Sequence, residues 1–374
     1  MARDSVRRSV IPSRLLWGVG SVAGACALSL ALITAVLAVA GVDVGHAFGA
    51  LWRGSVGSWY ALTSSTLVRS VPLMLAGLAV ALAFRAGVWN IGAEGQLLVG
   101  AAVAAAVGLH WSESLGALVI VPAVLLAGAA GAGWSGIAAL LRRRFGVLEV
   151  ISTIMLNFVA LYLVGYLVRG PLQEPLHIYP QTAPVPEIAR LPALFAGTRL
   201  HWGFPIAVII AMALWWFLRS TAAGFRVRVV GQNPQAARVT GRIDVGRTIT
   251  RAFVASGALA GLAGGIEVLG VTFALYENIS PGYGYSAIAV ALLARLHPLG
   301  VVGTAVLFGA LRAGALSMQR EAAVPAVVVS VVEGMLILLI LAGTRWHDLR
   351  GATLPLGPRR ATEPAGTVAA EEGV

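Results

Sequence analysis

Residues 219–251 read RSTAAGFRVRVVGQNPQAARVTGRIDVGRTITR, the longest basic and polar passage in a chain that is otherwise almost entirely apolar. The passage contains seven arginines. In its middle, Asn233 is a good N-cap, because its side-chain oxygen accepts a hydrogen bond from an otherwise unpaired backbone N–H. Pro234 suits the first helical position, and Gly241 suits a left-handed helix stop. The pattern predicts a two-turn helix held between two membrane spans on the arginine-rich side.

Two interpretations of this loop follow from its residue chemistry. A short rigid helix offered to the cytoplasm is typical of a docking element for another protein. The arginines around it are equally suited to meet anionic lipid headgroups at the membrane surface. Residue chemistry alone leaves both hypotheses open.

The composition indicates a polytopic membrane protein. Of 374 residues, 58% are hydrophobic and only 11% are charged, and the mean hydropathy is +0.84. A soluble domain carries about 25% charged residues. The net charge of +11 would suggest nucleic acid in a soluble protein, but the positive-inside rule explains it here without such a partner.

The absence of certain residue types excludes several functions. Cys26 is the single cysteine, so neither an intrachain disulfide nor a cysteine-based metal site is indicated, and no metal-ligand spacing is present. The chain has no lysine, so all 27 basic residues are arginine. A P-loop needs a lysine for the nucleotide phosphates. If ATP drives the function, the ATPase is therefore a different polypeptide.

Hydropathy predicts an all-α protein of about ten transmembrane helices, with a range of eight to ten. With the N- and C-termini in the cytoplasm, 20 arginines fall on the cytoplasmic side and five outside, which supports this orientation. Helix 285–294 is too short to cross about 30 Å of hydrocarbon alone, so broken or short helices are expected. The apolar segments are 15–41, 59–83, 90–109, 116–141, 150–168, 203–218, 252–275, 285–294, 299–316 and 324–343.

The same pattern gives the domain organisation. We expect a cytoplasmic N-terminus over 1–14, with the first apolar run retained as a helix, and a single transmembrane domain over 15–349. An irregular external loop over 170–201 holds six of the 17 prolines. A disordered cytoplasmic tail is expected over 350–374.

Residues 84–96, FRAGVWNIGAEGQ, place polar groups at the opening of an apolar segment. Ionisable groups at membrane depth usually face the bundle interior or a wet cavity, and glycines that interrupt a span suggest a broken helix. Asn90, Glu94 and Gln96 are therefore candidates for a translocation path or hinge. The alternative is a helix end at the cytoplasmic interface, with Glu94 solvated and Arg85 reaching to the surface.

A similar interruption occurs in the second half, where SPGYGY at 280–285 precedes the short run 286–294. Two interrupted segments in the two halves are the pattern expected of repeat-built transporters. Other buried polar candidates are Asn157, Glu267 and Glu333. Paired acids could relay protons, but a helix–helix hydrogen bond, or an ion pair with a residue such as Arg312, is the commoner explanation.

Two glycine patterns have structural explanations. Gly257, Gly261 and Gly265 are consecutive small-xxx-small steps and predict a tight helix contact. Gly133-Trp134-Ser135-Gly136 resembles the serine motif of intramembrane proteases. Such a serine needs a histidine base at similar depth, and the six histidines all fall in predicted loops or at span ends. A protease centred on Ser135 is therefore disfavoured.

Several long strings, in order, resemble the permease subunits of bacterial ABC importers. They are FRAGVWNIGAEGQLLVGA (84–101), EVISTIMLNFVALYLVGYLV (149–168), VVGQNPQAARVTG (229–241), SGALAGLAGG (256–265) and AIAVALLARLHPLGVVGTAVLFGALRAGA (287–315). The closest branch is the simple-sugar and nucleoside type, related to ribose and branched-chain amino-acid permeases. The resemblance runs from about residue 60 to 345. The NIGAEGQ and EVISTIMLN strings lean toward nucleoside permeases.

The resemblance implies a non-enzymatic transport subunit in the bacterial inner membrane, surrounded by lipid. Its partners would be a second permease, identical or paralogous, an ABC ATPase that binds ATP-Mg, and an extracytoplasmic solute-binding protein; this chain would bind no cofactor. The GxNPxAAxxxG stretch resembles the coupling helix that docks on the ATPase. The implied coupling residues are Asn233, Pro234, Gln235, Ala236, Ala237, Arg238 and Gly241. Arg242 departs from the family, which usually has an apolar residue directly after the glycine.

The implied mechanism is alternating access. Closure of the ATPases would move the helix at 234–240, inserted in a groove of the ATPase, and reorient the spans around a central path. Ala236→Asp or Ala237→Asp is then predicted to uncouple transport from ATP hydrolysis without unfolding the spans. The rival hypothesis is a stand-alone, proton-coupled secondary transporter that uses Glu267 or Glu333.

Overall fold

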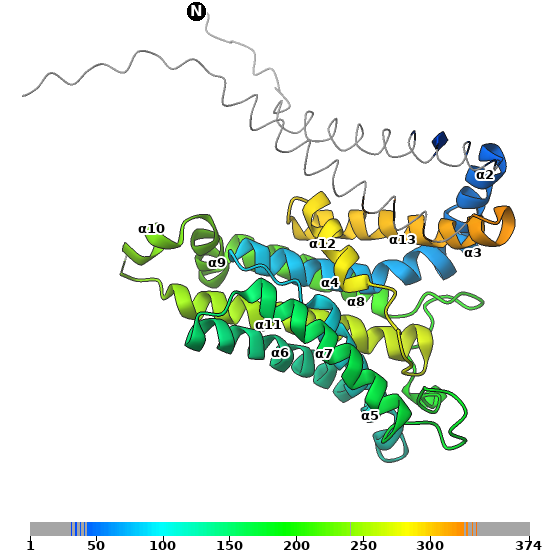
Figure 1. Ribbon diagram of the computed structural model, residues 1–374, viewed down its shortest axis with the longest axis horizontal. Coiled ribbons are helices and arrows are strands. Elements are labelled where there is room, and N and C mark those ends of the chain that lie inside the picture. The colour runs from blue at the N-terminus through cyan, green and yellow to red at the C-terminus, as the bar shows by residue number, and fades with distance from the viewer. Residues whose placement is uncertain are drawn as a thin grey trace, which may run out of the picture.

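The computed structural model describes residues 43–239 and 241–324, with a few single positions outside these ranges. In this part all regular structure is helical apart from two isolated bridges, Gln181 with Tyr276 and Ala193 with His201, which confirms the all-α fold (Figure 1). The α-helices are α2 (Val44–Ser55), α3 (Trp59–Ala61), α4 (Leu67–Arg85), α5 (Ala93–Leu115), α6 (Ile120–Phe145), α7 (Glu149–Arg169), α8 (Gly203–Ser220), α9 (Ala222–Gln232), α10 (Pro234–Val239), α11 (Val245–Glu267), α12 (Tyr283–Leu293) and α13 (Pro298–Ala322). Short 3₁₀ turns lie at Gly116–Val119 and Glu187–Ala189, and π-helical turns at Leu62–Thr66 and Val268–Thr272.

Six helical stretches of the described residues are long and apolar enough to cross a membrane. One of them, Ala93–Phe145, turns back at Gly116, whose φ is +55°, and so comprises both α5 and α6. The eight apolar segments predicted between 59 and 316 each contain a helix. Segments 15–41 and 324–343 lie almost wholly outside the described residues, so the count of about ten remains a prediction.

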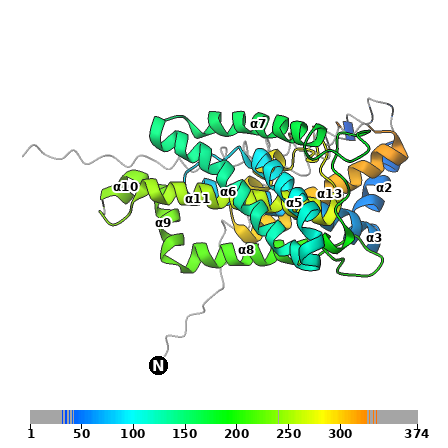
Figure 2. The same cartoon turned by 90° about the horizontal axis from the view of Figure 1, so that it is seen from below.

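Helices α4 and α11 form the centre of the bundle. Over its most apolar window α4 is 83% buried and α11 is 72% buried, whereas α7 is 28% buried. A helix that is apolar all round, as α4 is, belongs in the interior. The outer helix α7 instead exposes large side chains such as Phe158 and Tyr162, and it runs along the margin of the bundle (Figure 2).

The predicted tight helix contact lies between α6 and α11. A Cβ at Gly257 or Gly261 would clash with backbone carbonyls of α6, those of Gly131 and Ala127 respectively. The two backbones therefore approach as closely as the small-xxx-small pattern predicts. Ser135 belongs to this contact: it is buried beside Gly257, and its hydroxyl donates to the Ala132 carbonyl at 2.9 Å.

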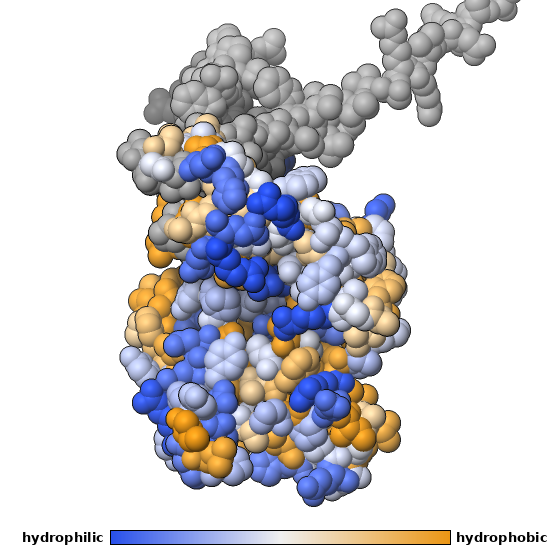
Figure 3. Space-filling model, turned by 90° about the vertical axis from the view of Figure 1, so that its right-hand side faces the viewer, coloured by the Kyte–Doolittle hydropathy of each residue, from blue (hydrophilic) through white to orange (hydrophobic). Residues whose placement is uncertain are grey.

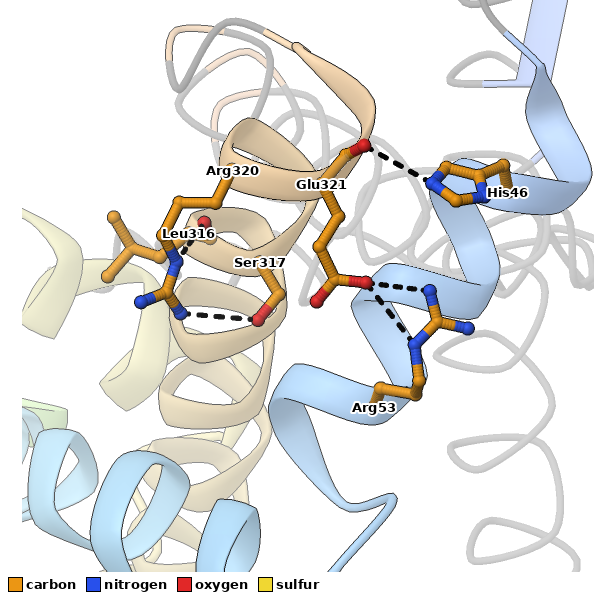
Figure 4. Close-up of polar contacts among 6 residues, drawn as sticks. All are labelled: His46, Arg53, Leu316, Ser317, Arg320 and Glu321. Carbon is orange, nitrogen blue, oxygen red and sulfur yellow. Dashed lines mark hydrogen bonds and ion pairs between the residues drawn. The ribbon is translucent and has the colours of Figure 1, made fainter.

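Helix α2 was not expected from hydropathy. Asp43 caps it by accepting the backbone N–H of His46 at 3.0 Å, which is the one local signal in the sequence. Figure 4 shows how it is fastened to the end of α13: Arg53 Nη2 donates to Glu321 Oε2 at 2.7 Å, and His46 Nε2 lies 3.2 Å from the Glu321 carbonyl oxygen.

The two ends of the bundle differ. One end carries α9 and α10, and the other carries the long connection 170–202 (Figure 1). That connection is irregular, as predicted, and it is tied down by backbone bonds such as Thr182 N to Leu275 O at 2.8 Å and Val185 N to Phe273 O at 2.7 Å. Figure 3 looks onto the end that carries the connection 170–202, where polar surface in the middle is bordered by apolar surface on the sides.

Candidate functional site

The basic passage 219–251 holds two short helices, rather than one, between the end of α8 and the start of α11. The predicted helix is α10, and α9, which precedes it, was missed although Thr221 gives a cap signal by accepting the backbone N–H of Gly224 at 2.9 Å. Asn233 separates the two. Its Oδ1 accepts the backbone N–H groups of Gln235 at 3.0 Å and Ala236 at 2.9 Å, as the sequence predicted. Gly241 follows with φ +64°, the expected left-handed stop.

Helix α10 has one buried face and one exposed face. Ala237 is completely buried and packs with Val230 of α9 and Val245 of α11. The exposed members are Asn233, Pro234, Gln235, Ala236 and Arg238. Val239 is 89% exposed, which is unusual for a large apolar side chain. The helix is therefore anchored by one alanine and presents the rest of its surface outward.

Helix α9 rests directly on the end of α4. A Cβ at Gly231 would clash with the Arg85 carbonyl, and the Gly231 Cα lies 3.4 Å from where a Cβ of Gly87 would stand. Gly87 adopts φ +77°, which lets the chain reverse after α4. The two stretches singled out in the sequence, 84–96 and 229–241, are thus in backbone contact.

A basic hollow of about 350 Å³ lies where α4, α8, α9 and α11 meet. It is lined by Arg226, Arg242, Arg247 and Arg251, and by apolar side chains of α4, α8, α9 and α11. Asp244 caps α11 and pairs with Arg247 at 3.1 Å. Arg242, the departure from the family pattern, therefore lines a positively charged depression.

The segment after α4 re-enters the bundle. Asn90 is fully buried, and its Nδ2 donates to Ser256 Oγ at 2.8 Å, while that hydroxyl donates to the Ala79 carbonyl at 2.7 Å. Ala79 precedes the end of α4 by six residues, about 9 Å along the helix. The interruption predicted at 84–96 is therefore a chain that folds back beside α4. The cytoplasmic-interface alternative does not describe Asn90.

Asn90 and Gln96 pair their side-chain amides reciprocally, with both N···O distances 3.0 Å. Asn157 of α7 holds the same segment from another side: its Oδ1 accepts Gly95 N at 2.8 Å and its Nδ2 donates to Ile91 O at 2.9 Å. Buried polar groups with all partners made rigidify a core. These three predicted site residues therefore all hold the segment 90–96, and Asn157 Nδ2 also lies 3.4 Å from the Tyr285 hydroxyl of α12.

Glu94 joins this network to α12. It is 7% exposed, and its Oε2 accepts the backbone N–H of Gly284 at 2.6 Å. Helix α12 has 11 residues and is about 16 Å long, half of a span. Its N-terminus, where unpaired N–H groups favour negative charge, therefore points at a buried carboxylate. Arg312 of α13 donates to Ser286 Oγ at 2.7 Å and lies over the Tyr283 ring, beside the same helix start.

Glu267 lies apart from this cluster. It is 4% exposed at the end of α11, and in the described part of the chain its Oε2 has no hydrogen-bond partner. Among the described residues, no hydrogen bond joins Glu267 to the Asn90 network. Glu333 is outside the described residues. The candidates thus divide into the α10 surface, the Asn90–Glu94–Gln96–Asn157 cluster, and Glu267 alone.

Comparison with known proteins places these features in a family. The family described as branched-chain amino acid transport system / permease component matches residues 62–341. The guanosine ABC transporter permease protein NupP of Bacillus subtilis is 38% identical over 84% of this chain and 90% of its own. The glucose ABC transporter permease protein TsgB13 of Haloferax volcanii is 36% identical over 89% of each chain.

A nucleoside ABC transporter permease protein of Lactococcus lactis, NupB, is 30% identical over 74% of this chain and 78% of its own. No solved structure matches significantly. The matched region includes both the α10 surface and the Asn90 cluster.

Proposed function

The chain belongs to the permease-component family of the branched-chain amino acid transport system, and on that premise we propose that it is the translocating subunit of an ATP-driven importer for nucleosides or simple sugars. It is a multi-pass protein of the plasma membrane, as the family and its apolar helices indicate. Its relatives move guanosine, glucose and nucleosides by name. The guanosine permease, at 38% identity, favours a nucleoside.

The observation that carries the proposal is the form of α10. A helix that is capped by Asn233, anchored by the buried Ala237, and otherwise exposed is suited to insert into a groove on another protein. ATP hydrolysis would occur with Mg²⁺ on a separate ABC ATPase. This chain would bind no cofactor and act through Asn233 to Arg238 and Gly241.

The arginine distribution supports the orientation that this role requires. Among the described residues, twelve arginines lie at the end that carries α9 and α10: 85, 142, 143, 144, 219, 226, 228, 238, 242, 247, 251 and 295. Five lie at the opposite end: 53, 169, 190, 199 and 320. By the positive-inside rule the α10 end is cytoplasmic, where the ATPase would dock, and the connection 170–202 faces the solute-binding protein.

Alternating access assigns different roles to the buried clusters. In the described residues no buried side-chain nitrogen or oxygen of Asn90, Gln96 or Asn157 lacks a hydrogen-bond partner, which favours a fixed hinge over an open path. Glu94 and the start of α12 are the better position for path-lining groups, because a half-helix N-terminus and interrupted spans mark transport sites in repeat-built transporters. A second permease, identical or paralogous, would complete the path.

Purification from the native membrane tests the proposal. The tagged, detergent-solubilised protein is isolated and the co-purifying chains are identified. An ABC ATPase and a permease partner in fixed ratio support it. A chain that purifies alone and still moves nucleosides in liposomes without ATP overturns it.

A further inference from the structure

A second basic hollow lies on the other side of α9. It has a volume of about 200 Å³ and is formed where the ends of α4, α8 and α9 meet the start of α13. The residues used below line it: Arg85, Trp215, Arg219, Arg228, His297 and Pro298. None of them belongs to the surface of α10 or to the Asn90–Glu94 cluster.

The hollow collects positive charge without compensation. Three arginines line it, and in the described part of the chain no carboxylate lies within 4.0 Å of any of them. The Nε atom of Arg228 is buried and makes no hydrogen bond within the described residues. A buried donor without a partner is costly. The site therefore lacks an acceptor that carries negative charge.

Two further contacts fix side chains that line the hollow. Arg85 Nε donates to the Leu296 carbonyl at 2.7 Å, which fixes that side chain at the start of α13. His297 accepts the Gly300 N–H with Nδ1 at 3.3 Å as the cap of α13. Burial, and then the charge of Arg85, lower the pKa of His297 from its ordinary value. The charged form of its ring is therefore disfavoured, and the three arginines carry the positive charge of the hollow.

The level of the hollow relative to the membrane indicates the source of the anion. Arg219 lies over the ring of Trp215 at 5.4 Å on the last turn of α8, and Trp216 beside it is 59% exposed. Tryptophan is enriched at the level of lipid headgroups, and α8 is an outer helix of the bundle (Figure 2). An anion that enters here comes from the membrane surface.

We propose that this hollow binds the phosphate of an acidic phospholipid headgroup in the cytoplasmic leaflet. Guanidinium groups bind phosphate oxygens through paired, charge-assisted hydrogen bonds, and such a phosphate would supply the acceptor that Arg228 Nε lacks. It would also neutralise the repulsion between Arg85 on α4 and Arg228 on α9. The bound lipid thereby fastens α9 to the bundle. Free phosphate shares this chemistry, and the test separates the two.

The experiment uses the purified full-length protein, with any chains that co-purify, after delipidation in detergent. Thermal unfolding is followed with added phosphatidylglycerol, phosphatidylcholine or inorganic phosphate, and retained lipid is measured by native mass spectrometry. The test variants are Arg228→Gln and the exposed Arg219→Gln. The matched controls are Arg143→Gln and Arg144→Gln, which remove the same charge from the exposed end of α6 on the same side.

We expect saturable stabilisation by phosphatidylglycerol alone, with retention weakened about tenfold in each test variant, as loss of one charge-assisted contact implies, and unchanged in both controls. Because Arg219 is exposed, we expect Arg219→Gln to remain folded. This variant therefore tests the lipid site if Arg228→Gln does not fold. Equal loss in test and control variants would reduce the effect to net charge and overturn the site. Equal stabilisation by inorganic phosphate would overturn the lipid assignment.

Discussion

Glu94 of α5 caps α12 across the bundle, because its carboxylate oxygen accepts the backbone N–H of Gly284 at 2.6 Å although the residues are 190 positions apart. The contact admits no larger residue: a Cβ at Gly284 would clash with the Glu94 backbone. Two interrupted segments, one from each half of the chain, therefore meet through one side chain and one glycine.

Replacing Glu94 should weaken the start of α12. A hydrogen bond to a charged group contributes about 1.5–3 kcal/mol, so we expect Glu94→Ala to lower stability by about 2 kcal/mol and Glu94→Gln, which retains an acceptor, by less. Thermal unfolding in detergent measures both. The matched control is Glu113→Ala, at the exposed far end of the same helix. Equal effects at 94 and 113 would show that the cap contributes nothing.

Ala236→Asp tests docking by α10. Ala236 is exposed, so we expect its stability to stay within about 0.5 kcal/mol of wild type. A charge buried unpaired in an interface costs about 2–5 kcal/mol, so ATP-driven uptake in proteoliposomes should fall at least about tenfold. Ala236→Ser is the control. Normal uptake by the aspartate variant at normal expression would refute the docking role.

Ala237→Asp, predicted from sequence to act in the same way, is a less direct test. Ala237 is fully buried against Val230 and Val245. An aspartate there places a charge inside the small cluster that anchors α10. We expect hydrogen exchange to rise across α9 and α10 in this variant and to stay unchanged in Ala236→Asp. Equal exchange in the two variants would contradict the packing of α10.

Gly231→Ala should separate α9 from the end of α4. The added Cβ would meet the Arg85 carbonyl, and overpacking costs about 1–3 kcal/mol. The matched control is Gly133→Ala on α6, where a Cβ meets nothing within 4 Å. The control should be neutral or more stable by about 0.4–1 kcal/mol. Thermal unfolding of the two variants side by side gives the answer, and equal melting temperatures would argue against the contact.

Acid should destabilise the end of the bundle that carries the connection 170–202, because His201 there becomes protonated. This residue is 1% exposed, its Nδ1 accepts the Gly203 N–H at 3.1 Å, and burial, followed by the charge of Arg199, lowers its pKa from 6.5 to about 4. The unfolded chain takes up the proton near pH 6.5 and the folded chain only near pH 4, so stability is full above pH 6.5. About 3 kcal/mol is then lost as the pH falls to 4.

His201→Asn keeps the acceptor and removes the titration, so its melting temperature should vary less between pH 7 and 4 than that of wild type. The exposed His110→Asn is the control and should retain the wild-type pH profile. Parallel profiles for wild type and His201→Asn would exclude the buried imidazole as the cause.

The sequence predicted the features that depend on local patterns. Asn233, Pro234 and Gly241 delimit α10 within one residue of the expected helix, and the short run at 286–294 is the half-length helix α12. These succeeded because caps, proline and glycine act within a few residues of their own position. The glycine steps on α11 succeeded because close helix approach requires a small residue wherever it occurs.

What could not be predicted depends on distant pairing. No local rule makes Ser256 the partner of Asn90, which lies 166 positions away, or places Gly284 on Glu94. Helix α9 was missed because arginines and glycines interrupt its hydrophobic periodicity. The packing of Gly231 on Arg85 compensates for this weak pattern. Glu267 was grouped with the other polar candidates, but no hydrogen bond among the described residues joins it to them.

The contact between Gly231 and Arg85 joins two backbones with no side chain between them. A contact between side chains can adjust, because the side chains can change rotamer at little cost. A glycine packed against a carbonyl group has no side chain that could adjust. A displacement of α9 would therefore be passed directly to the end of α4. The link between the surface that an ATPase would push and the helix at the centre of the bundle therefore includes a direct contact of two backbones.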